Sequence, residues 1–129
     1  MKSFTELLKS SKNFVHLKPA DLRDIEIAEK KLALLFSKEY LEYLERYSLA
    51  SADGHEYTGI TTSPRLSVVE VTLRNWEQNP YASKSQYVVE ETNMDGVVIW
   101  QDASGAVYQT SPNISPIKIA ESLREYIEQ

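Results

Sequence analysis

The sequence lacks several residue types on which familiar binding and catalytic sites depend. It contains no cysteine, so disulfide bonds and thiolate metal sites are excluded, as is common in a reducing compartment. It has only four glycines, and neither Gly54 nor Gly59 is followed by the Lys-Ser/Thr pair of a phosphate-binding loop. A dinucleotide-binding fingerprint and a Gly-x-Ser-x-Gly nucleophile motif are absent as well. The usual nucleotide-binding and serine-hydrolase patterns are therefore excluded.

Histidine is also scarce, with His16 and His55 as the two examples. The pair His55-Glu56 resembles the start of a zinc-protease motif, but Gly59 stands where the second histidine is needed. Carboxylates predicted at turns are usually solvated, which argues against acid–base catalysis of the glycosidase kind. We therefore expect no catalytic residues, no metal and no cofactor.

Basic residues are outnumbered, because Lys and Arg total 14 against 19 Asp and Glu, a formal net charge of -5. Such a chain repels phosphate backbones and anionic membranes, so we expect a basic protein partner rather than nucleic acid or membrane. No stretch approaches the length of an apolar membrane span, and the first residues lack the apolar core of a signal peptide. These features predict a cytoplasmic protein.

The stretch Gln86 to Gln109 organises the predicted fold. Its Val-, Ile-, Tyr- and Trp-rich runs predict three strands, at 87–89, 97–101 and 106–108. Asp95-Gly96 tolerates the positive φ of a tight hairpin, and residues 102–105 read as a turn closed by glycine. The run 97–100 is apolar on both pleat faces, so we expect a central strand covered on both sides. A three-stranded antiparallel meander follows from this pattern.

Helices are predicted where capping residues precede apolar positions at 3.6-residue spacing. Ser3 and Glu6 form a capping box for a first short helix, and two more helices follow Asp21 and Ser37. Residues 66–73 are ambiguous, since their valines favour strand while helical spacing favours a helix over 69–78. A strand is predicted within 55–60, and Ser115-Pro116 predicts the start of a terminal helix. The 129 residues and 42% hydrophobic content suit one α+β domain over 1–129.

Several segments, taken in order and spacing, resemble the SUKH superfamily of the Smi–Knr cell-wall-regulator type. The resemblance extends from about residue 22 to the end of the chain. Its opening signature is carried by an Ile-x-x-Ala-Glu-x-x-Leu helix and a tyrosine-rich helix after it. The matching segments are 25–32, 36–47, 54–59, 68–72, 87–91, 95–108 and 122–126.

The resemblance implies a fold and a role. The fold is a central, mostly antiparallel β-sheet with helices packed on one side and at its ends. Many bacterial members are immunity proteins that neutralise a co-encoded polymorphic toxin domain, often a nuclease or deaminase, by tight binding. The alternative is a cytosolic regulatory module that binds an endogenous protein. Either a monomer or a homodimer fits the sequence.

Acidic residues near one end of the predicted meander are the expected contacts for a basic toxin domain. Glu90, Glu91 and Asp95 fall near the first turn, whereas Asp102 lies at the opposite end. Asp53 and Glu56 are further members, from the segment before the first strand. Trp76 is either an aromatic surface anchor or, the favoured alternative, part of the core. The opposing interpretation is that these acids are ordinary solvated turn residues.

Overall fold

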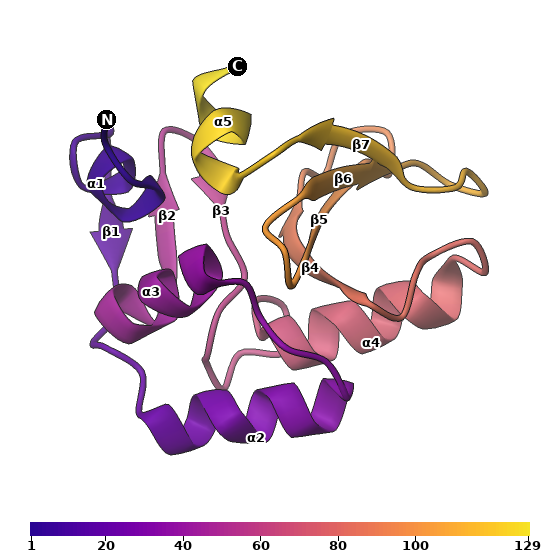
Figure 1. Cartoon of the computed structure of the whole chain (residues 1–129), viewed down its shortest axis with the longest axis horizontal. Coiled ribbons are helices and arrows are strands. Elements are labelled where there is room, and N and C mark those ends of the chain that lie inside the picture. The colour runs from indigo at the N-terminus through magenta and orange to yellow at the C-terminus, as the bar shows by residue number, and fades with distance from the viewer.

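A computed structural model describes residues 1–129 as a single α+β domain with five helices and two antiparallel sheets (Figure 1). The helices are α1 (Phe4–Lys9), α2 (Leu22–Leu32), α3 (Lys38–Tyr47), α4 (Val68–Gln78) and α5 (Leu123–Glu128). The strands are β1 (Val15–His16), β2 (Ala50–Ala52), β3 (His55–Glu56), β4 (Gln86–Glu91), β5 (Val98–Asp102), β6 (Val107–Thr110) and β7 (Ile117–Ala120). The predicted α+β class is confirmed.

The helix starts follow the capping residues of the sequence. Ser3 and Glu6 form both bonds of the predicted capping box, and the side chains of Asp21 and Ser37 accept backbone N–H groups at the starts of α2 and α3. Ser67 caps α4 in the same way, which settles the ambiguous 66–73 segment as helix. The capping residues therefore determine where four of the five helices begin.

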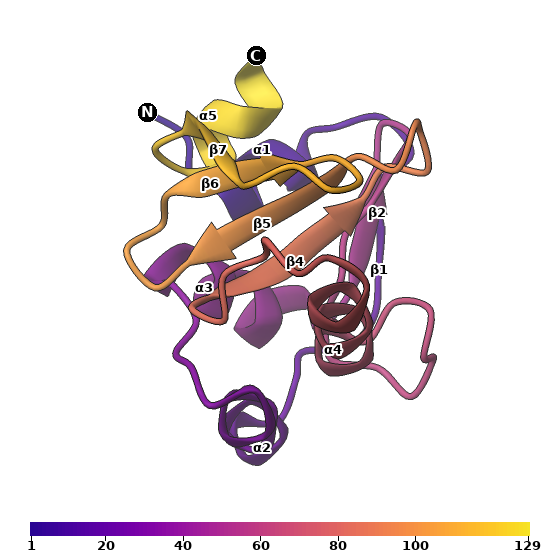
Figure 2. The same cartoon turned by 90° about the vertical axis from the view of Figure 1, so that its right-hand side faces the viewer.

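The larger sheet has the strand order β4-β5-β6-β7 (Figure 2). The smaller sheet has the order β1-β2-β3. The predicted meander corresponds to β4, β5 and β6, with β5 in the interior of the sheet. Gln86 pairs with Asp102, so Asp102 lies at the end of the sheet away from the 92–97 loop, as predicted. Helix α4 runs beneath β4 in Figure 1 and packs against it.

A β-bulge in β4 decides which side chains face the core. Val88 pairs with Trp100, but Glu90 pairs with Ile99 because Val89 is the extra residue. The register shift places Glu90 on the same sheet face as Ile99 and sends Glu91 to the face covered by α4. Ile99 belongs to the main core and Trp100 to a second cluster with Val71 and Val88, so β5 is covered on both sides, as predicted.

Buried tyrosines join the helices to the sheets through their hydroxyl groups. Tyr43 donates to Thr58 O and accepts from Ala50 N, at 2.8 and 2.9 Å. Tyr40 lies 2.8 Å from Thr58 Oγ1, and Tyr87 donates to the buried Gln101 side chain at 2.7 Å. Each phenol thus combines ring burial with a satisfied polar group, as a well-packed core requires.

Two sequence predictions of local structure are wrong, and a third is confirmed in part. The segment after Ser115-Pro116 begins strand β7, and the terminal helix starts later, where Ser122 caps α5. Asp95-Gly96 lies in a longer 92–97 loop and not in a two-residue hairpin. The strand predicted within 55–60 is present but short, since β3 covers His55–Glu56. Pairing of β7 with β6, and of β3 with β2, determines where these strands begin and end.

No helix in the chain is long and apolar enough to cross a membrane.

Candidate functional site

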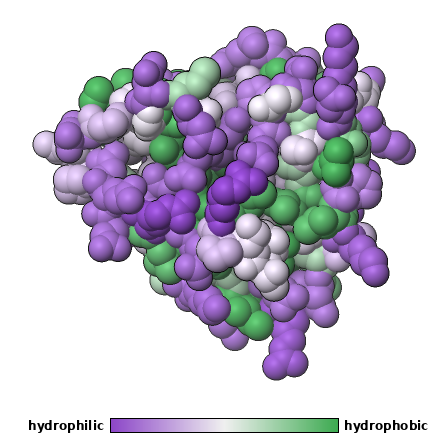
Figure 3. Space-filling model, turned by 180° about the vertical axis from the view of Figure 1, so that it is seen from behind, coloured by the Kyte–Doolittle hydropathy of each residue, from purple (hydrophilic) through white to green (hydrophobic).

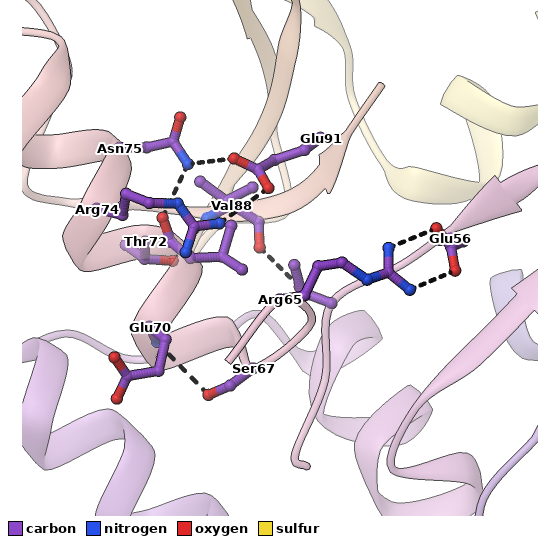
Figure 4. A network of polar contacts seen from close by, with 11 residues as sticks. Glu56, Arg65, Ser67, Glu70, Thr72, Arg74, Asn75, Val88 and Glu91 are labelled. Atoms are coloured by element: carbon purple, nitrogen blue, oxygen red, sulfur yellow. Dashed lines mark hydrogen bonds and ion pairs between the residues drawn. The ribbon is translucent and has the colours of Figure 1, made fainter. Parts of the chain in front are cut away.

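Glu56, predicted as a partner contact, lies on β3 and is held by an arginine of the chain itself. Arg65 donates to both oxygens of Glu56, at 2.8 and 3.0 Å, in the two-bond geometry shown in Figure 4. Hydrogen bonding from the guanidinium lowers the pKa of the Glu56 carboxyl. Both side chains are about half exposed, so the pair is fixed in position yet remains accessible to a partner.

Glu91 is held in a similar way at the end of β4. Its two oxygens accept from Arg74 at 3.0 Å and from Asn75 at 2.9 Å, both on α4 (Figure 4). Asn75 also donates to Val71 O within the helix, which fixes the amide. The ambiguous segment therefore matters for the site, because its helical form supplies the partners of Glu91.

The structure brings Glu56 and Glu91 together although 34 positions separate them in the chain. Both line a shallow depression with Arg65, Thr58, Leu66 and Asn93, which we call the Arg65 pocket. Its two carboxylates face two arginines, so little unbalanced negative charge is left there. Sequence reasoning missed Arg65 and Arg74, because only tertiary contacts reveal that they neutralise the predicted acids.

Glu90, predicted as the companion of Glu91, is buried and is not a solvated turn residue. Its side chain is 5% exposed, and its two oxygens accept from His55 Nδ1 at 2.7 Å and Tyr126 Oη at 2.8 Å. His55 stacks on Tyr57 with its ring nearly parallel, 10° apart. Burial, followed by the negative charge of Glu90, raises the pKa of Tyr126. Glu90 therefore joins β3, β4 and α5 internally.

The other predicted contacts differ in exposure. Asp53 and Asp95 are exposed, at the β2–β3 turn and in the 92–97 loop respectively, and neither forms an ion pair. Trp76 is half-buried and packs against the core, with its indole N–H donating to Ser83 O and Gln86 O. Lys84 lies 4.7 Å from the Trp76 ring centre, a cation–π contact that covers part of the remaining surface.

The largest concavity lies elsewhere, between α2, the 60–67 segment and the start of α4. Its volume is about 720 Å³, and it is lined by Asp24, Ile27, Ile60, Val69 and Glu70 among others. We call it the α2–α4 cleft. In Figure 4 the Glu70 side chain points away from the Glu56–Arg65 pair. The 60–67 segment thus contributes to both concavities, with Pro64 and Ser67 in the cleft and Arg65 and Leu66 in the Arg65 pocket.

The surface seen from behind is mostly hydrophilic, with apolar atoms in separate patches (Figure 3). Several large apolar residues are nevertheless exposed, among them Val15, Leu17 and Leu22. Nowhere in the chain do three His, Asp or Glu side chains converge as ligands for a metal ion.

Comparison with known proteins places the chain in a family. No curated protein matches it with significant similarity. The sequence model of a SUKH family, described as SMI1-KNR4 cell-wall, matches residues 1–129, the whole chain. Since the match covers every element of the fold described above, the chain belongs to the SUKH family of the SMI1-KNR4 cell-wall type.

Proposed function

We propose that this protein is an immunity protein, which binds a co-encoded toxin domain one to one and masks it without catalytic turnover. Membership of the SUKH family over the whole chain carries the proposal, because proteins of this family are typically toxin immunity proteins. The net charge of -5 supports a basic partner such as a nuclease or nucleic-acid deaminase domain, whose substrate is anionic. The protein would act in the cytosol, where the toxin's target lies.

The proposed contact surface is the Arg65 pocket together with Asp53 and Asp95, and the helix that carries Trp76 is the alternative surface. Ion pairs hold Glu56 and Glu91 in place, so a partner would meet preset carboxylates and arginines rather than flexible ones. Asp53 and Asp95 bring charge that no ion pair within the chain neutralises. We leave Glu90 out of this surface because its carboxylate is enclosed by His55 and Tyr126.

Co-production with the toxin domain encoded next to the gene tests the function. We expect a stable 1:1 complex by size-exclusion chromatography with light scattering. We also expect toxin activity to fall in proportion to the immunity protein added, reaching zero near equimolarity. Full toxin activity in the presence of excess protein would rule out neutralisation by masking.

A charge-removal variant tests the surface. Asp53→Asn/Asp95→Asn removes two charges and suits the backbone, since both residues have positive φ, which asparagine tolerates. We expect slower association and a weaker dependence of affinity on salt. Glu26→Gln/Glu45→Gln, on exposed faces of α2 and α3, is the matched control. Equal affinities and salt slopes for the two variants would move the binding surface elsewhere, to the helix that carries Trp76.

The second candidate is a regulatory module that binds an endogenous cytosolic protein, and the cell-wall description of the matched family favours it. The two functions differ in their predicted partner. A toxin gene immediately upstream and the 1:1 complex described above favour immunity. The absence of a neighbouring toxin gene favours regulation. Capture of an endogenous protein by the wild type, but not by surface variants, would support the same conclusion.

A further inference from the structure

We propose that the α2–α4 cleft receives a basic, partly apolar segment of the partner protein. The inference rests on the proposed function, because it names the part of the toxin domain that the immunity protein grips. It adds a surface that the sequence did not indicate, separate from the Arg65 pocket and bordering the same 60–67 segment.

The cleft has the size and lining of a site for side chains. Its volume of about 720 Å³ lies within the usual range of ligand pockets, about 300–1,000 Å³. Ile27 and Ile60 provide apolar surface on two of its walls, and the Ile27 side chain is still 41% exposed. A partner that covers Ile27 would therefore remove apolar surface from water, which favours binding.

The charges of the cleft differ from those of the Arg65 pocket. Asp24 and Glu70 are exposed, and their carboxylates form no ion pair and accept no hydrogen bond within the chain. Asp21 is the cap of α2, and Lys31 is the single basic residue of the lining. The starts of α2 and α4 add about half a positive charge each, which still leaves the cleft negative. Unpaired carboxylates around apolar walls suit a cationic side chain.

The occupant follows from these contacts. A Lys or Arg has an apolar stem and a charged head, so its stem can lie on Ile27 and Ile60 while its head meets Asp24 and Glu70. Arginine is favoured over lysine, because its planar fork binds carboxylates through two hydrogen bonds and is more weakly hydrated. Lys31, in the last turn of α2, disfavours a second cation at that end of the cleft.

A charge-reversal pair tests the cleft in the complex with the neighbouring toxin domain. Asp24→Lys/Glu70→Lys changes the cleft, whereas Glu26→Lys/Glu77→Lys makes the same change of net charge on the same two helices at residues outside the cleft lining. We expect the cleft variant to weaken binding by about 10- to 100-fold more than the control, mainly through faster dissociation. Equal losses for the two variants would overturn the inference and leave the immunity function standing.

A peptide probe tests the cleft without the toxin. We would titrate the full chain with an amidated peptide of alternating leucine and arginine and, as control, with one in which glutamate replaces arginine. We expect the leucine–arginine peptide to shift the NMR amide signals of Asp24, Ile27 and Glu70, and the glutamate peptide to leave them unchanged. Shifts confined to other surfaces, or an undiminished response in Asp24→Lys/Glu70→Lys, would overturn the proposal. A toxin domain that fails to bind the wild type would instead overturn the proposed function.

Discussion

Four tyrosines of the core should make the protein unfold at alkaline pH. Tyr40, Tyr43, Tyr57 and Tyr87 are at most 2% exposed, and burial raises the pKa of each phenol above its ordinary value. In the unfolded chain the same groups ionise at about pH 10. Above that pH the unfolded state binds fewer protons than the folded state, so the free energy of unfolding falls as pH rises. Below it both states are protonated and these groups add no pH dependence.

The magnitude follows from the number of buried phenols. Each one lowers the free energy of unfolding by about 1.4 kcal/mol for every pH unit above its unfolded pKa. The four together therefore lower it by about 5–6 kcal/mol per pH unit. A stability of about 5–10 kcal/mol is then cancelled within about one to two pH units. We expect cooperative unfolding between about pH 11 and 12, followed by far-UV circular dichroism together with the near-UV absorbance of tyrosinate.

Tyr57→Phe is the control for this reasoning. The Tyr57 hydroxyl forms no hydrogen bond within the chain, whereas that of Tyr43 forms two, so removing it should change the stability at neutral pH little. Above pH 10 the free energy of unfolding of the variant should fall less steeply with pH than that of the wild type, because unfolding of the variant releases one proton fewer. Ionisation of all the tyrosines at about pH 10 with native circular dichroism retained would refute the argument.

Three further changes test particular contacts. Trp100→Ala should lower the free energy of unfolding by about 3–5 kcal/mol, because the indole is fully buried, and an unchanged urea midpoint would contradict this. Gly59→Ala should cost at least about 1–3 kcal/mol, since an added Cβ would lie 2.0 Å from Ser48 O; a wild-type thermal midpoint would argue against that close approach. Glu39→Ala should cost about 1–3 kcal/mol and speed amide exchange at Leu123, because the Glu39 carboxylate accepts the backbone N–H groups that begin α5. Unchanged exchange at Leu123 would count against that role.

Features encoded locally could be predicted from the sequence. A cap and the N–H groups that it binds lie within three residues, so Ser3, Ser37 and Ser67 mark helix starts whatever surrounds them. Ser122 and Glu125 have the same pattern at the start of α5, although Ser115-Pro116 also has the form of a helix start. The strand over Ile117 to Ala120 depends on pairing with β6, which no local signal specifies.

Two Asp-Gly pairs show how context decides a turn. Asp53-Gly54 joins β2 to β3 directly, with both residues at positive φ, as a two-residue hairpin requires. Asp95-Gly96 also has positive φ, yet it lies within a loop that begins at Thr92 and ends at Val97. The dipeptide therefore predicts the backbone conformation at both places and the loop length at only one. Loop length depends on where strand pairing ends.

The acids of the site were the least predictable, because one extra residue in β4 exchanges their environments. Simple alternation from Tyr87 and Val89 would place Glu91 in the core and Glu90 outside it. The bulge at Val89 reverses this, so Glu90 meets His55 and Tyr126 while Glu91 meets α4. A bulge has no reliable signature in a single sequence, so the exposure of neighbouring acids could not be assigned from it.

Net charge alone says little about where a basic partner would bind, because the fold redistributes the charge. Glu56 and Glu91 lie in a concavity, but Arg65 and Arg74 neutralise them locally. The carboxylates of the α2–α4 cleft have no such partner, because Arg65, before α4, and Arg74, within α4, pair with acids of β3 and β4. An incoming cation gains more from an unpaired carboxylate than from one whose ion pair must first be broken. The position of the arginines, more than that of the acids, therefore determines which acidic surface is free to bind.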